Sequence, residues 1–175
     1  MGGVKSTALI SVDEYLRTTY RPDCDYVDGE VLERNVGEKD HSDLQSELIH
    51  YFRGRRRQWR VYAYAEQRVQ VSVRRFRAPD ICVYAGASPS EQVFRTPPFI
   101  CIEIVSPKDR MERMQDRIDD YISFGVPYVW VIHPRTRRVW VHTPQVIEEI
   151  KDGVLHTESP VLAVSLTEVF AGLDE

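Results

Sequence analysis

Apolar residues recur with a helical period in two long stretches of the chain. In residues 41–59 and 109–124 they return every three or four positions, which predicts two helices that each bury one face. Gly125 stands where the second helix should end, because glycine readily adopts the left-handed conformation of a C-cap. The arginine run at 55–57 would lie in the last turn of the first helix, where cations suit the helix dipole.

Helix starts are indicated by three Ser-x-x-Glu or Ser-x-x-Gln patterns, in which side chains cap the first backbone amides of a helix. Ser11 opens the pattern of a short helix that should end near Tyr20. Ser42 opens the pattern for helix 41–59, and Ser165 opens the pattern for a C-terminal helix.

Alternation with period two and short apolar runs predict the strands. Residues 99–105 are apolar except for Glu103, which is typical of a central strand buried on both faces. Asp28-Gly29, between two strand-like pairs, predicts a hairpin with a type I′ turn, and residues 151–153 predict a last hairpin turn. The other predicted strands cover residues 61–65, 69–73, 79–84, 128–132 and 139–142.

The order of these elements predicts an α/β (α+β) fold with a mixed central sheet and a helix on each face. A helix and a hairpin precede this sheet, and antiparallel strands follow it. A chain of 175 residues, 42% of them hydrophobic, is long enough to bury the core of one domain. We therefore expect a single domain over residues 1–175, with its core at about residues 40–133.

Composition argues against membrane and secreted proteins. No apolar run approaches the roughly 20 residues of a membrane-spanning helix, and residues 1–12 lack the apolar core of a signal peptide. Cys24, Cys82 and Cys101 show no Cys-x-x-Cys spacing, which argues against a zinc site and a disulfide framework. We expect no membrane contact and a reducing, cytoplasmic location.

The net charge of −4 conceals an asymmetry along the chain. Residues 51–77 contain nine arginines and one acid, whereas residues 145–175 contain seven acids and one base. The basic stretch is either a set of solvated helix and strand faces or a surface that faces phosphates, although the acidic pI of about 5.8 argues against constitutive, tight DNA binding. On the second interpretation, the nucleic-acid-binding residues are Arg55, Arg56, Arg57, Arg74 and Arg75.

Glu103 is the most informative candidate for chemistry. Burying a lone carboxylate in an apolar strand is costly unless a cation is paired with it. That cation is either an arginine in a buried salt bridge or a metal ion. Asp80 begins a neighbouring predicted strand, and two carboxylates at the ends of adjacent strands can converge on one ion. Oxygen ligands of this kind favour Mg²⁺ or Mn²⁺ over zinc.

Several motifs, in their order and spacing, resemble the PD-(D/E)XK nuclease superfamily and, more narrowly, the bacterial family described as "putative restriction endonuclease". The matching segments are residues 14–16, 26–30, 41–48, 66–71, 78–80, 103–107, 116–117 together with Tyr121, and 125–131. The resemblance covers about residues 10–171. It implies a restriction-endonuclease-like fold, a divalent-metal-dependent endonuclease that hydrolyses DNA, and Mg²⁺ or Mn²⁺ held by Asp80, Glu103 and the carbonyl of Ile104.

Two positions depart from the family pattern. The superfamily's lysine would fall at Val105, and a lysine that the narrower family often carries on the following helix corresponds to Arg117. An arginine stays protonated, so Arg117 can stabilise a charged transition state but is a poor base. Lys108 is a nearby substitute. The expected catalytic residues are Asp80, Glu103, Lys108 and Arg117, and candidates for the periphery of the site are Glu30, His41, Glu47 and Gln67.

Two other functions remain open beside the nuclease. One is a catalytically inactive module that binds nucleic acid or protein on a nuclease fold, which Val105 and Arg117 favour. The other is a purely structural homodimer domain. Because two active sites related by a two-fold axis most simply cut both strands of a duplex, we expect a homodimer. Its contact would use the C-terminal strands at 139–142 and 146–154 or the first helices, unless the helix from Ser165 covers that sheet edge within one chain.

Overall fold

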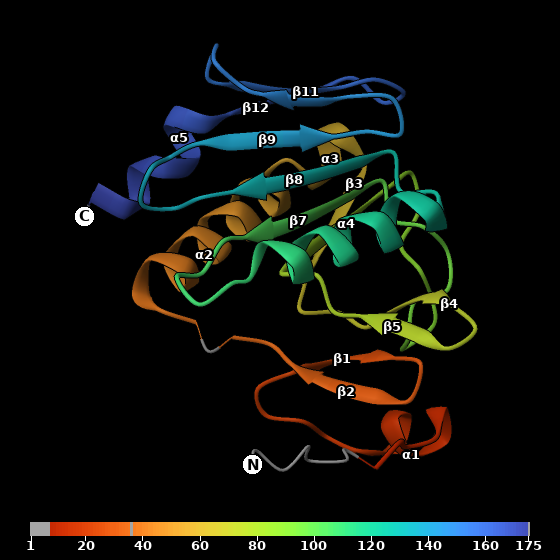
Figure 1. Ribbon diagram of the computed structural model, residues 1–175. Helices are drawn as coiled ribbons and strands as arrows, with labels where there is room; N and C mark the ends of the chain where they lie inside the picture. The colour runs from red at the N-terminus through yellow and green to blue at the C-terminus, as the bar shows by residue number, and fades with distance from the viewer. Residues whose placement is uncertain (1–7, 36, 175) are drawn as a thin grey trace.

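Six strands form the central sheet of the computed structural model, which describes residues 8–35 and 37–174 (Figure 1). Strands β7 and β8 run parallel and are joined through helix α4 (Met111–Phe124), while the other neighbouring pairs run antiparallel. In spatial order the strands are β10 (Ile147–Glu149), β9 (Val139–His142), β8 (Tyr128–Ile132), β7 (Ile100–Ile104), β6 (Ile81–Ala85) and β3 (Val61–Ala65). This mixed sheet confirms the predicted fold class.

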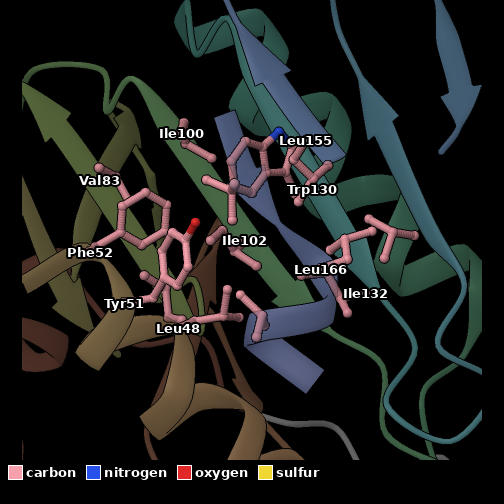
Figure 2. Packing of buried hydrophobic residues seen from close by; sticks show 14 of the residues in the cluster. Leu48, Tyr51, Phe52, Val83, Ile100, Ile102, Trp130, Ile132, Leu155 and Leu166 are labelled. Carbon is pink, nitrogen blue, oxygen red and sulfur yellow. The ribbon is translucent and has the colours of Figure 1, made fainter. Parts of the chain in front are cut away.

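Helices α2 (Lys39–Gly54) and α4 cover opposite faces of the central sheet. Side chains alternate along a strand, so Ile100, Ile102 and Ile104 of β7 pack on the α2 side. Cys101 and Glu103 point to the α4 side. Figure 2 shows the α2 face of the core, where aromatic and aliphatic side chains of α2 pack against those of the sheet. The predicted helix on each face is therefore confirmed.

A second sheet carries the N-terminal hairpin and lies below the central sheet in Figure 1. Asp28 and Gly29 have φ angles of 51° and 104°, and both residues of a type I′ turn need a positive φ. The predicted hairpin is thus confirmed. In spatial order the strands of this sheet are β2 (Glu30–Glu33), β1 (Cys24–Val27), β5 (Arg75–Arg77) and β4 (Val69–Ser72).

The C-terminal part of the chain adds a hairpin and a helix to the α2 side of the core. Its elements are β11 (Val154–Thr157), β12 (Leu162–Ser165), α5 (Leu166–Ala171) and a 3₁₀ helix, η1 (Gly172–Asp174). Leu155, Leu162 and Val169 are buried in the core there. Helix α5 packs against α2 rather than along the edge strand β10, where Ile147 is 62% exposed.

Helix ends follow the sequence at most of the predicted positions. The Ser11 hydroxyl accepts a hydrogen bond from the Glu14 N–H at the start of α1 (Val12–Arg17), and Ser165 caps α5 in the same way. Helix α1 ends earlier than predicted, and α4 begins two residues later but ends at Gly125 as expected. Every helix within residues 8–35 and 37–174 is too short or too polar to cross a membrane.

The single helix predicted over residues 41–59 is wrong, because the chain forms two helices there. The first, α2, starts after Glu38, so Ser42 lies inside the helix and does not cap it. Arg55 leaves the helical backbone, and its guanidinium lies 3.6 Å from the centroid of the Tyr51 ring. Helix α2 therefore ends at Gly54, and a short second helix, α3 (Arg56–Trp59), follows.

Two strand predictions are also wrong. The strand predicted to end at Val73 stops at Ser72, and a turn leads into β5, which pairs with β1 of the N-terminal hairpin. The turn at residues 151–153 does not join two paired strands: β10 pairs with β9, and β11 pairs with β12. The turn residues are where they were expected, but tertiary packing chose other partners for the flanking strands.

His142 of β9 gives the fold a testable dependence on pH. Its side chain is buried, and this burial lowers its pKa below 6.5, although the charge of Asp119 opposes the shift. The neutral imidazole therefore suits the folded chain, and stability that is present above about pH 6.5 is lost as the pH falls through the lowered pKa.

We expect His142→Gln to remove this part of the pH dependence. Urea unfolding at about pH 7.5 and about pH 5.5 should show a larger loss of unfolding free energy for the wild-type chain than for the variant. His50→Gln, which changes an exposed histidine on α2, is the matched control and should keep the wild-type difference. Equal losses in wild type and His142→Gln would contradict the prediction.

Candidate active site

Asp80 and Glu103 face each other across two neighbouring strands. Strands β6 and β7 pair Ile81 with Ile102, and the same antiparallel register continued by one residue places Asp80 opposite Glu103. The two residues are only 3% and 0% exposed, respectively. Two carboxylates buried side by side repel each other and lose their hydration, so the surrounding structure must supply positive charge.

Arg34 supplies positive charge to both carboxylates from the segment that follows β2. Its Nη2 atom donates to Asp80 Oδ1 at 2.7 Å and to Glu103 Oε2 at 3.0 Å. Burial alone would lower the pKa of Arg34, but the charges of Glu103, Asp80 and Asp25 outweigh it and raise the pKa well above its usual value. A single, permanently charged nitrogen therefore bridges the two carboxylates.

Asp80 has further partners on its other sides. The Ile104 N–H donates to Asp80 Oδ2 at 2.7 Å, and the Gln45 side chain donates to the backbone oxygen of Asp80 at 2.9 Å. His41 Nε2 lies 3.3 Å from Asp80 Oδ1. Burial raises the pKa of Asp80, but the charge of Arg34 and the hydrogen bond from His41 outweigh it and lower the pKa to about 2. Asp80 is therefore a carboxylate at any physiological pH.

Glu103 is held from the side of helix α4. Arg117 Nη1 donates to Glu103 Oε2 at 2.8 Å, and the Tyr121 hydroxyl donates to Glu103 Oε1 at 2.7 Å. Burial raises the pKa of Tyr121, and the charge of Glu103 raises it further, so the hydroxyl keeps its proton and remains a donor. Both oxygens of this carboxylate are thus satisfied by side chains.

A second layer of charges ties the N-terminal hairpin to α4. Asp25 of β1 accepts a hydrogen bond from Arg77 at 3.0 Å and another from the Ala78 N–H at 3.0 Å. Arg77 and Arg75 of β5 each donate to Asp120 of α4 at 2.7 Å. Asp25 and Arg77 are almost fully buried, so this layer of ion pairs holds the hairpin next to the Asp80–Glu103 pair.

A cleft of about 510 Å³ leads from the surface to Asp80. Residues 19–23 form part of its wall, and Arg34, His41, Gln45 and Asp80 lie along it. Arg34 also lines a narrower opening, together with Arg113 and Arg117. A substrate in the cleft would therefore contact both Arg34 and Asp80.

The donor set fits a hard divalent cation. Asp80 Oδ1 and Glu103 Oε2 converge on one point, since both lie within 3.0 Å of a single nitrogen, and carboxylate oxygens are ligands that Mg²⁺ and Mn²⁺ prefer. Within the part of the chain that the structure describes, no three Asp, Glu, His or Cys side chains gather around such a point. A metal at this site would thus depend on two carboxylates, a backbone carbonyl and water.

The structure brings some of the predicted site residues together and leaves others apart. Asp80, Glu103, Ile104, Arg117 and His41 form the cluster described above, although Ile104 contacts Asp80 through its N–H. Lys108 and Glu30 are exposed, Glu47 lies against Gly172 of η1, and Gln67 donates to the Gln92 carbonyl at 2.7 Å. None of these four residues has a hydrogen bond or ion pair with Asp80 or Glu103 among the described residues.

The structure places the arginines predicted to bind nucleic acid in different surroundings. Arg55 is separated from His41 by about 20 Å of α2, given a helical rise of about 1.5 Å per residue. Arg55 also binds Glu168, and Arg56 stacks over Tyr62. Arg75 is paired with Asp28 and Asp120, whereas Arg57 and Arg74 are exposed.

Asp25, Tyr121, Arg34 and Gln45 belong to the cluster but were not among the predicted site residues. Asp25 had a signal, because it stands between the apolar residues Cys24 and Tyr26. Tyr121 lies on the buried face of its helix, where an aromatic residue gives no sequence signal that its hydroxyl contacts a carboxylate. Arg34 lies in a polar stretch that was predicted to be a loop, and no pattern in that stretch indicates that its side chain turns inward.

Comparisons with known proteins identify the family. The model of the Uma2 family, described as "Putative restriction endonuclease", matches residues 12–173. The chain belongs to this family. Its fold is similar to a crystal structure from Anabaena variabilis ATCC 29413 described as "a putative nuclease belonging to DUF820", with a TM-score of 0.78, 24% identity, and coverage of 94% of this chain and 99% of that chain. No curated protein matches the sequence.

The contact between Tyr121 and Glu103 predicts a measurable loss of stability. Tyr121→Phe removes a hydrogen bond to a buried carboxylate, so we expect the free energy of unfolding to fall by about 1.5–3 kcal/mol. Tyr62→Phe is the matched control, because within the described residues the Tyr62 hydroxyl has no hydrogen-bond partner. Its loss should stay within about 0.5 kcal/mol. Urea unfolding measures both values, and similar losses in the two variants would refute the assignment.

Proposed function

We propose that this protein is a divalent-metal-dependent endonuclease that hydrolyses phosphodiester bonds of DNA at the Asp80–Glu103 pair. The observation that carries the proposal is the convergence of the two buried carboxylates on one cationic point at the end of a cleft. Membership of the restriction endonuclease family supports the reaction class. Asp80, Glu103 and the Ile104 carbonyl would hold Mg²⁺ or Mn²⁺, which when bound polarises the scissile phosphate and lowers the pKa of water.

The chain's own residues would prepare the site for an anionic substrate. Arg117 is held in place by Glu103 and offers a fixed positive charge next to the pair, where it stabilises the charge that develops on phosphate. Tyr121 fixes the orientation of Glu103 from the opposite oxygen. Lys108 and the exposed Arg57 and Arg74 would contact the DNA backbone, whose phosphates attract such cations.

A second candidate is a catalytically inactive module that binds nucleic acid or protein on this fold. The ion pairs of Arg34 and Arg117 favour it, because they neutralise the carboxylates without a metal. Such a module would bind DNA equally well in the presence of EDTA and would cut no phosphodiester bond.

A plasmid-nicking assay separates the two candidates. With Mg²⁺ or Mn²⁺ the wild-type chain should nick supercoiled DNA, and Glu103→Gln and Asp80→Asn should each lower the rate by about 100-fold or more. Glu112→Gln, an exposed position on α4, is the matched control and should leave the rate unchanged. Circular dichroism must show that each variant is folded. Equal nicking by wild type and Glu103→Gln would mean that a contaminating nuclease produces it.

We also propose that the active form is a homodimer in the cytoplasm. Strand β10 is the edge strand of the central sheet. Its first residue, Ile147, and the preceding Val146 are 62% and 54% exposed, so a second copy has a sheet edge to pair with. The three cysteines are free thiols, as a reducing compartment maintains them.

Light scattering at micromolar concentration should give a mass of twice the 20.4 kDa of one chain. Ile147→Lys places a charge on the proposed contact and should shift the mass to that of one chain. A single-chain mass for the wild type throughout a dilution series would exclude the dimer.

A further inference from the structure

The Arg34 Nη2 atom contacts both carboxylates of the Asp80–Glu103 pair, as a metal ion held by the pair would. We propose that Arg34 is the resident cation of the Asp80–Glu103 pair, and that it must withdraw before a divalent metal binds. This inference rests on the proposed function, because it concerns the same site and the same metal. It assigns to Arg34 a role that the family resemblance does not supply.

Arg34 and a divalent metal would compete for the same two carboxylate oxygens. Arg34 Nη2 lies 2.7 Å from Asp80 Oδ1 and 3.0 Å from Glu103 Oε2. A Mg²⁺ ion needs oxygen ligands at roughly 2.0–2.1 Å. An ion that contacted both oxygens would approach them more closely than the guanidinium nitrogen does, so the two cations would compete for the same two oxygens. Even a small displacement would leave two like charges in van der Waals contact in a buried site, which is strongly unfavourable.

The other cation of the cluster does not block the site in this way. Arg117 contacts Glu103 Oε2 at 2.8 Å from α4, but it makes no ion pair with Asp80 among the described residues. It binds one carboxylate from the side, whereas Arg34 bridges both. Arg34 and Arg117 thus carry the same charge and share one oxygen, and they differ in whether they occupy the bridging position.

Arg34 also borders open space into which its side chain could move away from the carboxylates. It lies outside the regular strands and helices, and it lines the cleft of about 510 Å³. Its Nη1 atom is buried without a hydrogen-bond partner among the described residues and lies 3.7 Å from Asp25 Oδ1. The guanidinium is therefore anchored mainly through its contacts with Asp80 and Glu103, and a metal that replaces it at those oxygens removes that anchor.

Metal titration of the full chain tests the inference without relying on catalysis. After removal of metal with a chelator, MnCl₂ is titrated into each protein by calorimetry, and the thermal unfolding midpoint is followed with and without MnCl₂. We expect Arg34→Met to bind Mn²⁺ about tenfold more tightly than the wild type, or more, because a competing charge is gone. Mn²⁺ should also raise the unfolding midpoint of this variant more than that of the wild type.

Arg117→Met is the matched control, since it removes the same charge from the same Glu103 oxygen and leaves Arg34 in place. Its gain in Mn²⁺ affinity should be clearly smaller than that of Arg34→Met, because Arg34 still bridges the two carboxylates. Should Arg34→Met not fold, Arg34→Gln takes its place with the same expected gain.

Each alternative outcome is decisive. Equal Mn²⁺ affinity of wild type and Arg34→Met overturns the inference and leaves the proposed metal site standing. An equal gain in Arg117→Met also overturns it, because the gain then follows net charge and not the bridging position. Absence of Mn²⁺ binding to the folded Arg34 variant overturns both the inference and the metal dependence in the proposed function.

Discussion

The buried carboxylate of Glu103 is the constraint on which the arrangement of the surrounding elements depends. It is 0% exposed on β7, a strand whose other side chains fill the core. A charge in that position destabilises the fold unless partners reach it from every side. Those partners come from distant parts of the chain: Arg34 from the segment after β2, and Arg117 and Tyr121 from α4. Folding of the central sheet and docking of the N-terminal hairpin are therefore coupled through one carboxylate.

Charges also join the N-terminal layer to the rest of the molecule where apolar contacts are few. The apolar cluster around Tyr15 and Tyr26 is separate from the two larger clusters of the central sheet. Between the hairpin and α4 lie Asp25, Arg77 and Asp120, which are paired with one another. Removing one partner of such a buried pair costs about 3–5 kcal/mol, because the other charge stays behind. The ion-pair layer consequently fixes where the cleft lies as well as how stable the fold is.

Sequence periodicity predicted the central sheet and its two covering helices because those elements are amphipathic or buried throughout. It failed where long-range contacts decide the outcome. The turn after β10 is rich in turn residues, yet the strands on either side of it pair with other strands. Asp80 and Glu103 could be singled out because a charge in an apolar strand is conspicuous. Arg34 could not, since an arginine in a polar loop is ordinary until the fold shows where its side chain ends.

A pair of convergent, buried carboxylates has the same requirement in a metalloenzyme and in a purely structural ion-pair cluster, namely positive charge at the point of convergence. The residues around the pair decide how permanent that charge is. An arginine on α4, held by its helix and aimed at one oxygen, is compatible with a second cation beside it. Arg34 lies on an irregular segment, bridges both oxygens and lines a cleft. It neutralises the two carboxylates only until a divalent cation coordinates them more strongly. Arg117 and Arg34 therefore carry the same charge but differ in the backbone that holds them, a helix for Arg117 and an irregular segment for Arg34. Because of this difference, the cluster is neutralised without a metal and can still exchange one of its cations.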